Sequence, residues 1–484
     1  MHTRRTKIVC TIGPSSNSRK MLERLIQAGM DVARLNFSHG THAQHEQVLL
    51  DLKDLSVRCG RPIAVLQDLS GPKMRLGDIA LGGITLRRGD MVGLISEAGR
   101  LTRTEQNLLP VPIPELLDDL KPNKKLLIDD GKMALTVVRC EGAAGSPDRV
   151  VWARSSTAGR ITSRKGISAP GTRISIPAVT EKDLEDLRFG LQMGVDWVAV
   201  SFIRAVHDLD PIYELMSTMN KSAPIIAKIE RAEAVLNFAS IQKRVDGVMV
   251  ARGDLGVEMD FDEVPIVQKK LIRECNRLAM PVITATQMLE SMLSCPRPTR
   301  AEAADVANAI FDGTDAIMLS GETASGQYPV EAVRTMARIA KSAERAFFET
   351  DSYSARLSSP TNITAAVGGA GAHIAKEVGA RAIICATSTG STARQVASHR
   401  PAVPILAATN VPATRRRLCL SWGVESVLVE TVQDSDSMMR ATLESALQSR
   451  HIKNGDRVVL TAGVPVNHPG TTNFIRVHTV GSPL

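Results

Sequence analysis

The sequence predicts an α/β protein: a (β/α)8 TIM barrel with an inserted small β-barrel lid domain and a C-terminal α/β domain. Three observations favour this fold. Eight short apolar segments alternate with helix-like stretches, a long segment rich in glycine and β-branched residues interrupts them, and further short apolar segments follow a polar linker. Strands that are apolar throughout are typical of a parallel sheet covered on both faces. Eightfold alternation of strand and helix is typical of a closed barrel.

The eight expected barrel strands are short, and several lack alternation of apolar and polar residues. They span residues 7–13, 32–38, 63–69, 197–203, 225–230, 247–252, 282–288 and 316–320. The intervening helices carry signals of their own. Thr299 precedes one helix and Glu302 follows three residues later, as in a capping box, and Pro265–Leu278 is amphipathic.

The domain boundaries follow from where the strand-helix rhythm stops. Residues 71–171 contain short β-branched runs without helical periodicity, so we expect an inserted lid domain after the third strand. The barrel would then comprise residues 1–70 and 172–346. The polar stretch 347–362 is typical of a linker, and residues 347–484 would form the C-terminal α/β regulatory domain.

The composition indicates a globular protein of two or three domains. The chain has 484 residues, of which 43% are hydrophobic and 23% charged, and a chain of this length exceeds a single core. The formal net charge is +8 and only 3% of the residues are aromatic. Nucleic-acid binding would need clustered basic residues and stacking aromatics. An anionic small substrate fits the charge better, and no particular partner is the alternative.

Cysteine usage and the N-terminus predict a cytoplasmic location. The seven cysteines form no CxxC pair and have no metal-ligand spacing, which is typical of reduced thiols. The N-terminus lacks the features of a signal peptide. No apolar run approaches the roughly 18–20 residues that span a bilayer. We therefore expect a full-length cytoplasmic protein that binds neither membrane nor nucleic acid.

Polar residues follow six of the eight expected strands. In order along the chain they are Arg34, Asn36, Ser38, His39, Asp68, Lys228, Glu230, Arg252, Gly253, Asp254, Thr284, Thr286, Gln287, Ser320 and Glu322. Catalytic groups in barrels of this kind lie at the C-terminal ends of the strands. Packing does not explain so many polar side chains there, so we expect the functional site at this end.

Glu230 and Asp254 end adjacent expected strands, so their carboxylates can meet. Two carboxylates with room for water suit Mg2+, which retains waters and shares substrate oxygens. Gly253 would let the backbone approach a ligand closely. The alternative is a surface salt bridge of Glu230 with Lys228 or Arg231. Because Asp254 lies beside Glu230 in a glycine-flanked loop, we favour the metal site.

Lys228 lies two residues before Glu230 in the stretch PIIAKIE, and side chains two apart in a strand point the same way. A fixed ammonium near a metal stabilises negative charge developing on a phosphoryl oxygen or an enolate. An isolated lysine, by contrast, often extends to solvent. Arg34 and Arg75 are candidate phosphate clamps because guanidinium binds phosphate bidentately, although each alone is more often a surface residue.

Two glycine-containing segments were considered as phosphate sites. The chain has no GxxxxGK[ST] motif, and GGAGAHIA (368–375) follows no strand and lacks the third small residue of a dinucleotide turn, so we reject it. TSTGST (387–392) follows a strand-like run and precedes a helix-like stretch. Its hydroxyls and amides could form an anion nest, and the alternative is a plain Ser/Thr-rich helix cap.

Seven segments in order resemble the pyruvate kinase family. They are TKIVCTIGPSS, DVARLNFSHG, IIAKIERAEAV, VMVARGDLGVEM, ITATQMLESM, PTRAEAADVANAI and DAIMLSGETASGQYPVEAV. The resemblance runs from about Thr6 to the C-terminus and is weakest over residues 75–170. It implies a Mg2+- or Mn2+-dependent phosphotransferase that converts phosphoenolpyruvate and ADP to pyruvate and ATP, the final step of glycolysis.

The resemblance also implies roles for individual residues. Lys228 would stabilise the transferring phosphoryl group and the enolate, and Glu230 and Asp254 would hold the metal. Thr286 would assist protonation of the enolate, with a water held by Ser320. The remaining implied contacts are Arg34, Gly253 and Asp254 with the substrate, and Pro14, Asn36, His39, Arg75 and Lys165 with the nucleotide.

One departure from the family pattern concerns K+. Many members bind K+ through Asn, Ser, Asp and Thr side chains, with a Glu shortly afterwards. Asn36, Ser38 and Asp68 are present here, but Leu69 occupies the Thr position and Lys73 the Glu position. Lys73 offers an ammonium in place of the cation, so we expect activity without K+.

Regulation and assembly are implied by the resemblance alone. The loop Thr387, Ser388, Thr389, Gly390, Ser391 and Thr392 resembles the effector-phosphate loop of regulated members, and residues 463–473 resemble its facing loop. The facing loop lacks the Trp and Arg of fructose-bisphosphate-activated members, so a sugar monophosphate or AMP is the expected effector. Family members are usually homotetramers.

Two other functions are compatible with part of the sequence. A lyase or mutase barrel acting on phosphoenolpyruvate would also bind a carboxylate and Mg2+, but it has no use for Arg75, Lys165 or the lid. A non-catalytic metabolite-sensing scaffold predicts damage at Lys228, Glu230, Asp254 or Thr286, and all four are intact. We therefore expect the kinase.

Overall fold

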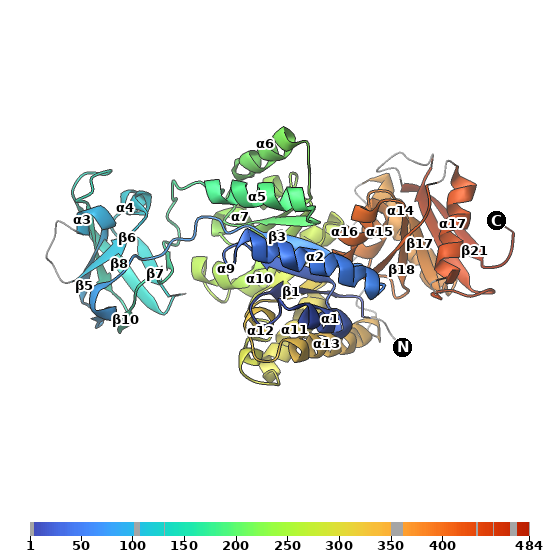
Figure 1. Ribbon diagram of the computed structural model, residues 1–484, viewed down its shortest axis with the longest axis horizontal. Helices are drawn as coiled ribbons and strands as arrows, with labels where there is room; N and C mark the ends of the chain where they lie inside the picture. The colour runs from blue at the N-terminus through green and yellow to red at the C-terminus, as the bar shows by residue number, and fades with distance from the viewer. Residues whose placement is uncertain are drawn as a thin grey trace.

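The computed structural model describes residues 4–100, 107–129, 131–349, 362–431, 434–448, 450–464 and 472–483. Figure 1 shows three units in a row, with the inserted domain at one end, the barrel in the middle and the C-terminal domain at the other end. Within the described ranges, no helix is long and apolar enough to cross a membrane.

The central unit is a closed barrel of eight parallel strands, and all eight expected strands are confirmed. The strands are β1 (Lys7–Ile12), β2 (Val32–Asn36), β3 (Ala64–Asp68), β12 (Trp197–Val200), β13 (Ile225–Ile229), β14 (Gly247–Ala251), β15 (Val282–Ala285) and β16 (Ala316–Leu319). β1 pairs in parallel with both β2 and β16, which closes the ring. Every residue of β1, β3 and β13 is buried, as the continuous apolar runs predict.

Helices cover the outside of the barrel. They are α1 (Arg19–Ala28), α2 (His42–Arg58), α5 (Glu181–Met193), α6 (Asp210–Met219), α7 (Ala232–Leu236), α8 (Phe238–Ile241), α9 (Arg252–Glu258), α10 (Val264–Arg277), α11 (Arg300–Asp312), α12 (Gly321–Ala324) and α13 (Pro329–Glu349), with 3-10 turns η2 (Val206–Leu209) and η3 (Glu290–Leu293). The expected capping box is confirmed at α11, where Thr299 Oγ1 accepts a hydrogen bond from the Glu302 amide.

The inserted domain leaves the barrel after β3 and returns before α5. It contains β4 (Ile84–Leu86), β5 (Met91–Ser96), β6 (Leu108–Val111), β7 (Lys125–Ile128), β8 (Met133–Glu141), β9 (Val150–Ser155), β10 (Gly159–Ile161) and β11 (Ile167–Ser168), with η1 (Ala80–Gly82) and the short helices α3 (Glu97–Arg100) and α4 (Pro114–Asp119). Its core extends along the chain to Ile174.

The predicted inserted β-barrel domain is confirmed, and its strands form a half-barrel. Among the described residues, six strands form a sheet in the order β11-β7-β8-β9-β5-β6, and β10 pairs separately with β4. The edge strand β6 contains Pro110, which has no N–H to donate to a further strand. The other edge, β11, has only two residues, so the two edges do not close the ring.

The C-terminal unit is an α/β sandwich. Its sheet has the order β19-β18-β17-β20-β21, with only β21 antiparallel to its neighbour. The strands are β17 (Ala382–Ala386), β18 (Ile405–Thr409), β19 (Val424–Leu428), β20 (Arg457–Gly463) and β21 (Thr472–Thr479), and the helices are α14 (Ile363–Glu377), α15 (Ser391–Ser398), α16 (Pro412–Arg417) and α17 (Ser435–Gln448), with the turn η5 (Leu418–Leu420). Residues 368–375 lie inside α14, so their rejection as a dinucleotide turn is confirmed.

The C-terminal unit packs against the N-terminal end of the barrel. Leu420 of η5 is fully buried in the cluster of side chains that fills the barrel, together with Val9, Ile226 and Trp197. Two polar contacts flank it: Trp197 Nε1 donates to the Arg417 carbonyl at 3.3 Å, and Arg416 pairs with Asp196 at 2.8 Å. Leu420 therefore closes the end of the barrel that lies opposite the lid.

We expect Leu420→Ala to destabilise the protein by about 2–5 kcal/mol, because it removes a fully buried side chain that packed neighbours cannot replace. The measurement is thermal or urea unfolding followed by circular dichroism. The control is Leu236→Ala, whose side chain is 83% exposed and should change stability by less than about 0.5 kcal/mol. An unchanged unfolding midpoint for Leu420→Ala would contradict the role of this residue.

Candidate active site

Lys228 is the centre of a buried charge cluster at the C-terminal end of the barrel. Its Nζ lies 2.7 Å from Glu230 Oε1 and 3.3 Å from Asp68 Oδ1, and it donates to Ser201 Oγ at 2.7 Å. Only 9% of Lys228 is exposed, so the alternative of a lysine extending to solvent is wrong. Glu230 does pair with Lys228, but it is 1% exposed, and this pair is not a surface salt bridge.

Asp68 joins Lys228 to Arg34. Arg34 Nε donates to Asp68 Oδ2 at 2.6 Å, and Arg34 Nη1 donates to Thr11 Oγ1 at 2.8 Å. Strands β1, β2, β3 and β13 thus each contribute one member of a continuous polar network. Because every member is buried, each charge depends on its partners in the network for stabilisation.

Burial and pairing compete in setting the pKa values of this cluster. Burial alone would lower the pKa of Lys228, but the carboxylates of Asp68 and Glu230 outweigh it and raise that pKa. Burial would raise the pKa of Asp68, but Arg34 and Lys228 hold it below its usual range. The pKa of Glu230 is raised by burial and by the negative charge of Asp254, which Lys228 offsets only in part. The ammonium is therefore firmly protonated, and Glu230 needs further positive charge nearby.

The segment after β12 fixes the second oxygen of Glu230. The Phe202 amide donates to Glu230 Oε2 at 2.8 Å. Phe202 has a φ of +57°, a left-handed conformation that is costly for an aromatic residue. Ser201, which precedes it, donates its hydroxyl to the Leu69 carbonyl at 2.7 Å and accepts from Lys228.

Thr286 lies on a strained segment after β15. Thr286 and Gln287 have φ values of +69° and +55° in succession, and a β-branched residue rarely adopts this conformation. The Gly253 amide donates to Thr286 Oγ1 at 2.8 Å, and Arg252 Nη2 donates to the Thr286 carbonyl at 2.7 Å. The start of α9 therefore holds Thr286, and the Gly253 amide is already engaged by its hydroxyl.

Ser320 lies at the end of β16 next to a buried acid. Its amide donates to Glu322 Oε2 at 2.7 Å, and the Leu289 amide donates to Glu322 Oε1 at 3.0 Å. Burial raises the pKa of Glu322. The Ser320 hydroxyl oxygen is buried and has no hydrogen-bond partner among the described residues, so it has room in its bonding for a water or a substrate atom.

A pocket of about 320 Å3 lies between the barrel and the lid, and several of the predicted site residues line it. The barrel contributes Glu230, Arg231, Asp254 and Glu258. The lid and its hinge contribute Lys73, Arg75, Asp129 and Lys165. Lys165 pairs with Asp129 at 3.0 Å, and Arg75 Nη1 donates to the Arg164 carbonyl at 3.0 Å. The pocket therefore combines cations suited to phosphate with carboxylates suited to a metal.

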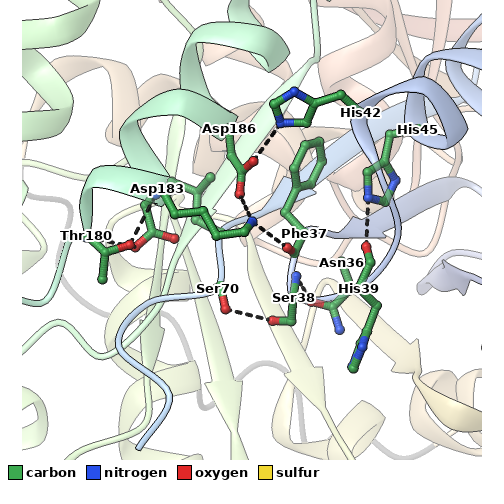
Figure 2. A network of polar contacts seen from close by, with 12 residues as sticks. Asn36, Phe37, Ser38, His39, His42, His45, Ser70, Thr180, Asp183 and Asp186 are labelled. Carbon is green, nitrogen blue, oxygen red and sulfur yellow. Dashed lines mark hydrogen bonds and ion pairs between the residues drawn. The ribbon is translucent and has the colours of Figure 1, made fainter. Parts of the chain in front are cut away.

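One buried carboxylate holds both ends of the lid hinge. Asp183 Oδ1 accepts from the Gly71 amide at 3.0 Å, where the chain leaves the barrel. Asp183 Oδ2 accepts from the Thr180 hydroxyl at 2.6 Å and from the Thr180 amide at 2.8 Å, where the chain returns (Figure 2). Gly71 has a φ of +63°, and a Cβ there would lie 2.6 Å from the Phe202 ring. The hinge is thus fixed against the segment that holds Glu230.

Three of the residues assigned to the nucleotide and the monovalent cation, Asn36, Ser38 and His39, lie at the end of β2 and in the loop that follows it. Asn36 Oδ1 accepts from the Ser38 amide at 3.2 Å, and Ser38 Oγ donates to Ser70 Oγ at 3.1 Å (Figure 2). The pKa of His39 is lowered by burial and by Lys73, Arg75 and Arg34. Pro14 follows β1 and is exposed, and it is not among the residues that line the pocket.

Three threonine hydroxyls of the candidate effector loop in the C-terminal unit are already hydrogen-bonded. The Gly390 amide donates to Thr387 Oγ1 at 2.9 Å, and the Ser391 amide to Thr389 Oγ1 at 3.4 Å. Thr392 Oγ1 shares a hydrogen bond of 2.7 Å with Thr472 Oγ1. The Thr387 and Thr389 hydroxyls therefore satisfy backbone amides at the start of α15, whose N-cap residue is Gly390. In the expected facing loop, residues 465–471 lie outside the described residues.

Sequence reasoning missed several residues of the site. The survey of strand ends left out the first and fourth strands, whose polar residues Thr11 and Ser201 join the cluster. Both could have been found by the same rule. Phe202 and the Arg231–Glu258 pair carry no comparable sequence signal, because their importance depends on contacts between different loops.

Cations and carboxylates from the barrel and the lid thus converge on one pocket, and phosphoryl transfer depends on this kind of positioning and charge neutralisation. The fold and the site together define a phosphotransferase built on a TIM barrel.

Comparison with known proteins specifies the family. The model for the pyruvate kinase barrel domain matches residues 3–333, and the model for the pyruvate kinase alpha/beta domain matches residues 365–478. The chain is 46% identical over 483 residues to "Pyruvate kinase" of Geobacillus stearothermophilus, covering 99% of this chain and 81% of the relative. It is 45% identical over 483 residues to "Pyruvate kinase 2" of Synechocystis sp., covering 99% and 80%. It is 43% identical over 486 residues to "Pyruvate kinase" of Staphylococcus aureus, covering 99% and 81%. The chain belongs to the pyruvate kinase family.

We expect Ser201→Ala to lower kcat of the pyruvate kinase reaction more than it raises KM, because Lys228 loses the hydroxyl that orients its ammonium. Loss of a hydrogen bond to a charged group costs about 1.5–3 kcal/mol, or roughly 10- to 100-fold in rate. Steady-state kinetics measure the split. Ser240→Ala is the control, because its exposed hydroxyl contacts only the Asn237 carbonyl among the contacts described. Equal kcat values for the Ser201 variant and the parent would contradict this positioning role.

Proposed function

We propose that the pocket between barrel and lid binds phosphoenolpyruvate and ADP and transfers the phosphoryl group from the first to the second, giving pyruvate and ATP. The observation that carries this proposal is the buried ammonium of Lys228, held between Asp68, Glu230 and Ser201. A preorganised cation that is excluded from bulk water stabilises charge that develops on the phosphoryl oxygens and the enolate. Phosphoryl transfer needs this kind of stabilisation more than it needs covalent help.

The residues present fit a divalent cation. Glu230 and Asp254 both line the pocket, and each repels the other's negative charge. Among the described residues, no group of three or more His, Cys, Asp or Glu side chains forms a complete metal cage. Two carboxylates leave positions for waters and substrate oxygens, as Mg2+ or Mn2+ prefers. When bound, the metal would neutralise phosphoryl and carboxylate charge, and Glu230 and Asp254 would hold it.

Different cations would bind different parts of the two substrates. Lys228 adjoins the pocket through Glu230, which lines it, and Lys228 and Arg34 belong to one buried charge cluster. Arg34, buried beside Asp68, and Lys228 would bind the phosphoryl group of phosphoenolpyruvate. Arg75 and Lys165 line the lid side of the pocket and would bind nucleotide phosphates. Lys165 must exchange Asp129 for a phosphate oxygen when it does so. Gly253 and Asp254 would bind the substrate carboxylate through their amides once the Gly253 amide leaves Thr286.

Enolate protonation would take place on the other side of the substrate. Thr286 is held by Gly253 and Arg252 in a strained conformation, and the Ser320 hydroxyl is buried without a partner among the described residues. A water bonded to Ser320 would deliver a proton to the enolate carbon, with the Thr286 hydroxyl beside it, and would regain a proton from the solvent. This step makes the transfer downhill, because the enolate does not persist.

We expect Lys228→Met to lower kcat by at least about 100-fold, because removal of one preorganised donor at developing negative charge costs that much. The measurement is pyruvate formation from phosphoenolpyruvate and ADP with Mg2+. Lys221→Met, an exposed lysine on the same barrel, is the control and should retain parental activity. No pyruvate formation by the folded parent would refute the proposed function. Parental kcat in a folded Lys228→Met variant would refute the role of this ammonium.

We propose that the ammonium of Lys73 replaces the monovalent cation that other members of the family bind. Asn36, Ser38 and Asp68 are retained, but Leu69 is fully apolar and buried and contributes no hydroxyl. Lys73 lines the pocket. Burial and the positive charge of Lys228 lower its pKa, and the nearby carboxylate of Asp68 opposes this shift. An ammonium here would supply the positive charge that other members take from K+.

We expect equal activity in K+-free buffer and with added K+, because Lys73 already provides the charge. The rate of the Lys73→Glu variant should rise when K+ is added, because the new carboxylate needs a cation to balance its charge. The comparison is initial rate with and without K+ for the parent, for Lys73→Glu and for the exposed control Lys121→Glu. If Lys73→Glu is as indifferent to K+ as the parent, the explanation is wrong.

Other features of the function stay predictions. Contacts of Pro14, Asn36 and His39 with the nucleotide are supported by the family resemblance, and for His39 also by its place near Lys73, Arg75 and Arg34. Binding of a phosphorylated effector at Thr387–Thr392, a homotetrameric assembly and a cytoplasmic location rest on the resemblance and the cysteine pattern alone.

A further inference from the structure

Arg231 and Glu258 form a buried ion pair at the wall of the pocket that no other role explains. Arg231 Nη1 lies 2.8 Å from Glu258 Oε1, and the two side chains are 9% and 7% exposed. Both line the pocket between barrel and lid. An ion pair this buried is costly to desolvate, and a pair of apolar residues of similar size would often be at least as stable. Stability alone therefore does not account for it.

The pair connects the two segments that carry the candidate metal ligands. Arg231 follows Glu230 directly, between β13 and α7. Glu258 is the last residue of α9, four residues after Asp254. Residues four apart on a helix share one face, so a contact to Glu258 also sets the face of α9 that carries Asp254. A displacement of α9 away from the segment after β13 would stretch this pair.

Phe202 adds a third point of contact. The Arg231 guanidinium lies over the Phe202 ring, 5.8 Å from its centroid, and the Phe202 amide holds Glu230 Oε2. The left-handed backbone of Phe202 is maintained against a conformational cost. Arg231 therefore acts on Glu230 in two ways, along the chain and through the ring.

The bonding of Arg231 is incomplete for a residue that serves stability. Its Nε is buried and has no hydrogen-bond partner among the described residues. A guanidinium optimised for stability would satisfy this donor. Instead, Arg231 Nη1 donates to Glu258 and the guanidinium lies over the Phe202 ring. These two contacts fix the distance between the segment after β13 and α9.

We propose that Arg231 and Glu258 are positioning residues that set the spacing of Glu230 and Asp254, and so the affinity of the site for a divalent cation. The inference rests on the proposed function, because it assigns these two carboxylates to the metal. It predicts that metal affinity depends on the pair even where protein stability does not.

The test measures the Mn2+ affinity of the full-length protein and its variants in the absence of substrates, by electron paramagnetic resonance of free Mn2+. The melting temperature of each protein is recorded in parallel. The variants are Arg231→Met, Glu258→Gln and the double variant. Each single variant leaves one buried charge unpaired, whereas the double variant leaves none. We expect the double variant to melt near the parent yet bind Mn2+ roughly 10- to 100-fold more weakly, as for residues that orient metal ligands.

The control is Arg244→Met. Arg244 also pairs with a carboxylate, Asp210, at 2.5 Å and lies over an aromatic ring, that of Tyr213, but it does not line the pocket. The Arg244→Met variant should bind Mn2+ with the same affinity as the parent. Arg231→Lys keeps the charge without the planar guanidinium and should give an intermediate affinity.

The Mn2+ affinities of the variants decide between the positioning role and a purely structural role of the pair. Parental Mn2+ affinity in the double variant overturns the positioning role and leaves the proposed function intact. If the double variant does not fold, parental affinity in Arg231→Lys overturns it instead. If the parent binds no Mn2+, or if Glu230→Gln does not weaken binding, the metal assignment fails and this inference fails with it.

Discussion

The burial of one ammonium between two carboxylates at the mouth of the barrel governs the rest of the site. Lys228, Asp68 and Glu230 are all nearly inaccessible, and none could remain charged there without the others. Arg34 pairs with Asp68. Ser201 accepts a hydrogen bond from Lys228, and the Phe202 amide donates one to Glu230. The apolar packing below holds the strand ends at the distances that this network needs. A barrel with the same strands but one missing charge would leave an unpaired ion in its core.

The two walls of the pocket differ in how firmly they are held. The barrel wall is continuous with the packed strands, whereas the lid joins through two chain segments that meet at Asp183. Gly71 packs so closely on Phe202 that no side chain fits there. Any motion of the lid is therefore transmitted to the segment that binds Glu230. Phosphoryl transfer depends on exact placement and exclusion of water, and a lid hinged on the segment that holds Glu230 favours both.

Three of the ten described non-glycine residues with positive φ lie in barrel loops at this site. Phe202, Thr286 and Gln287 all have left-handed conformations that their side chains disfavour. Each lies just after a barrel strand. Phe202 donates to Glu230, and Thr286 accepts hydrogen bonds from Gly253 and Arg252. Local sequence preference opposes these conformations, so only tertiary contacts maintain them. For the same reason no sequence pattern marked Phe202, and Thr286 was found by its position rather than its conformation.

The sequence by itself determined the barrel, the place of the insertion, the C-terminal domain and most of the charged residues of the site. These depend on local information: short apolar runs form strands, and polar residues at their ends meet at one rim because the strands are parallel. The tertiary structure decided which of those residues touch. The Ser201 bridge, the Arg231–Glu258 pair and the closure of the barrel by Leu420 all join segments far apart in the chain. Their geometry depends on strand register and loop packing, which composition and periodicity do not encode.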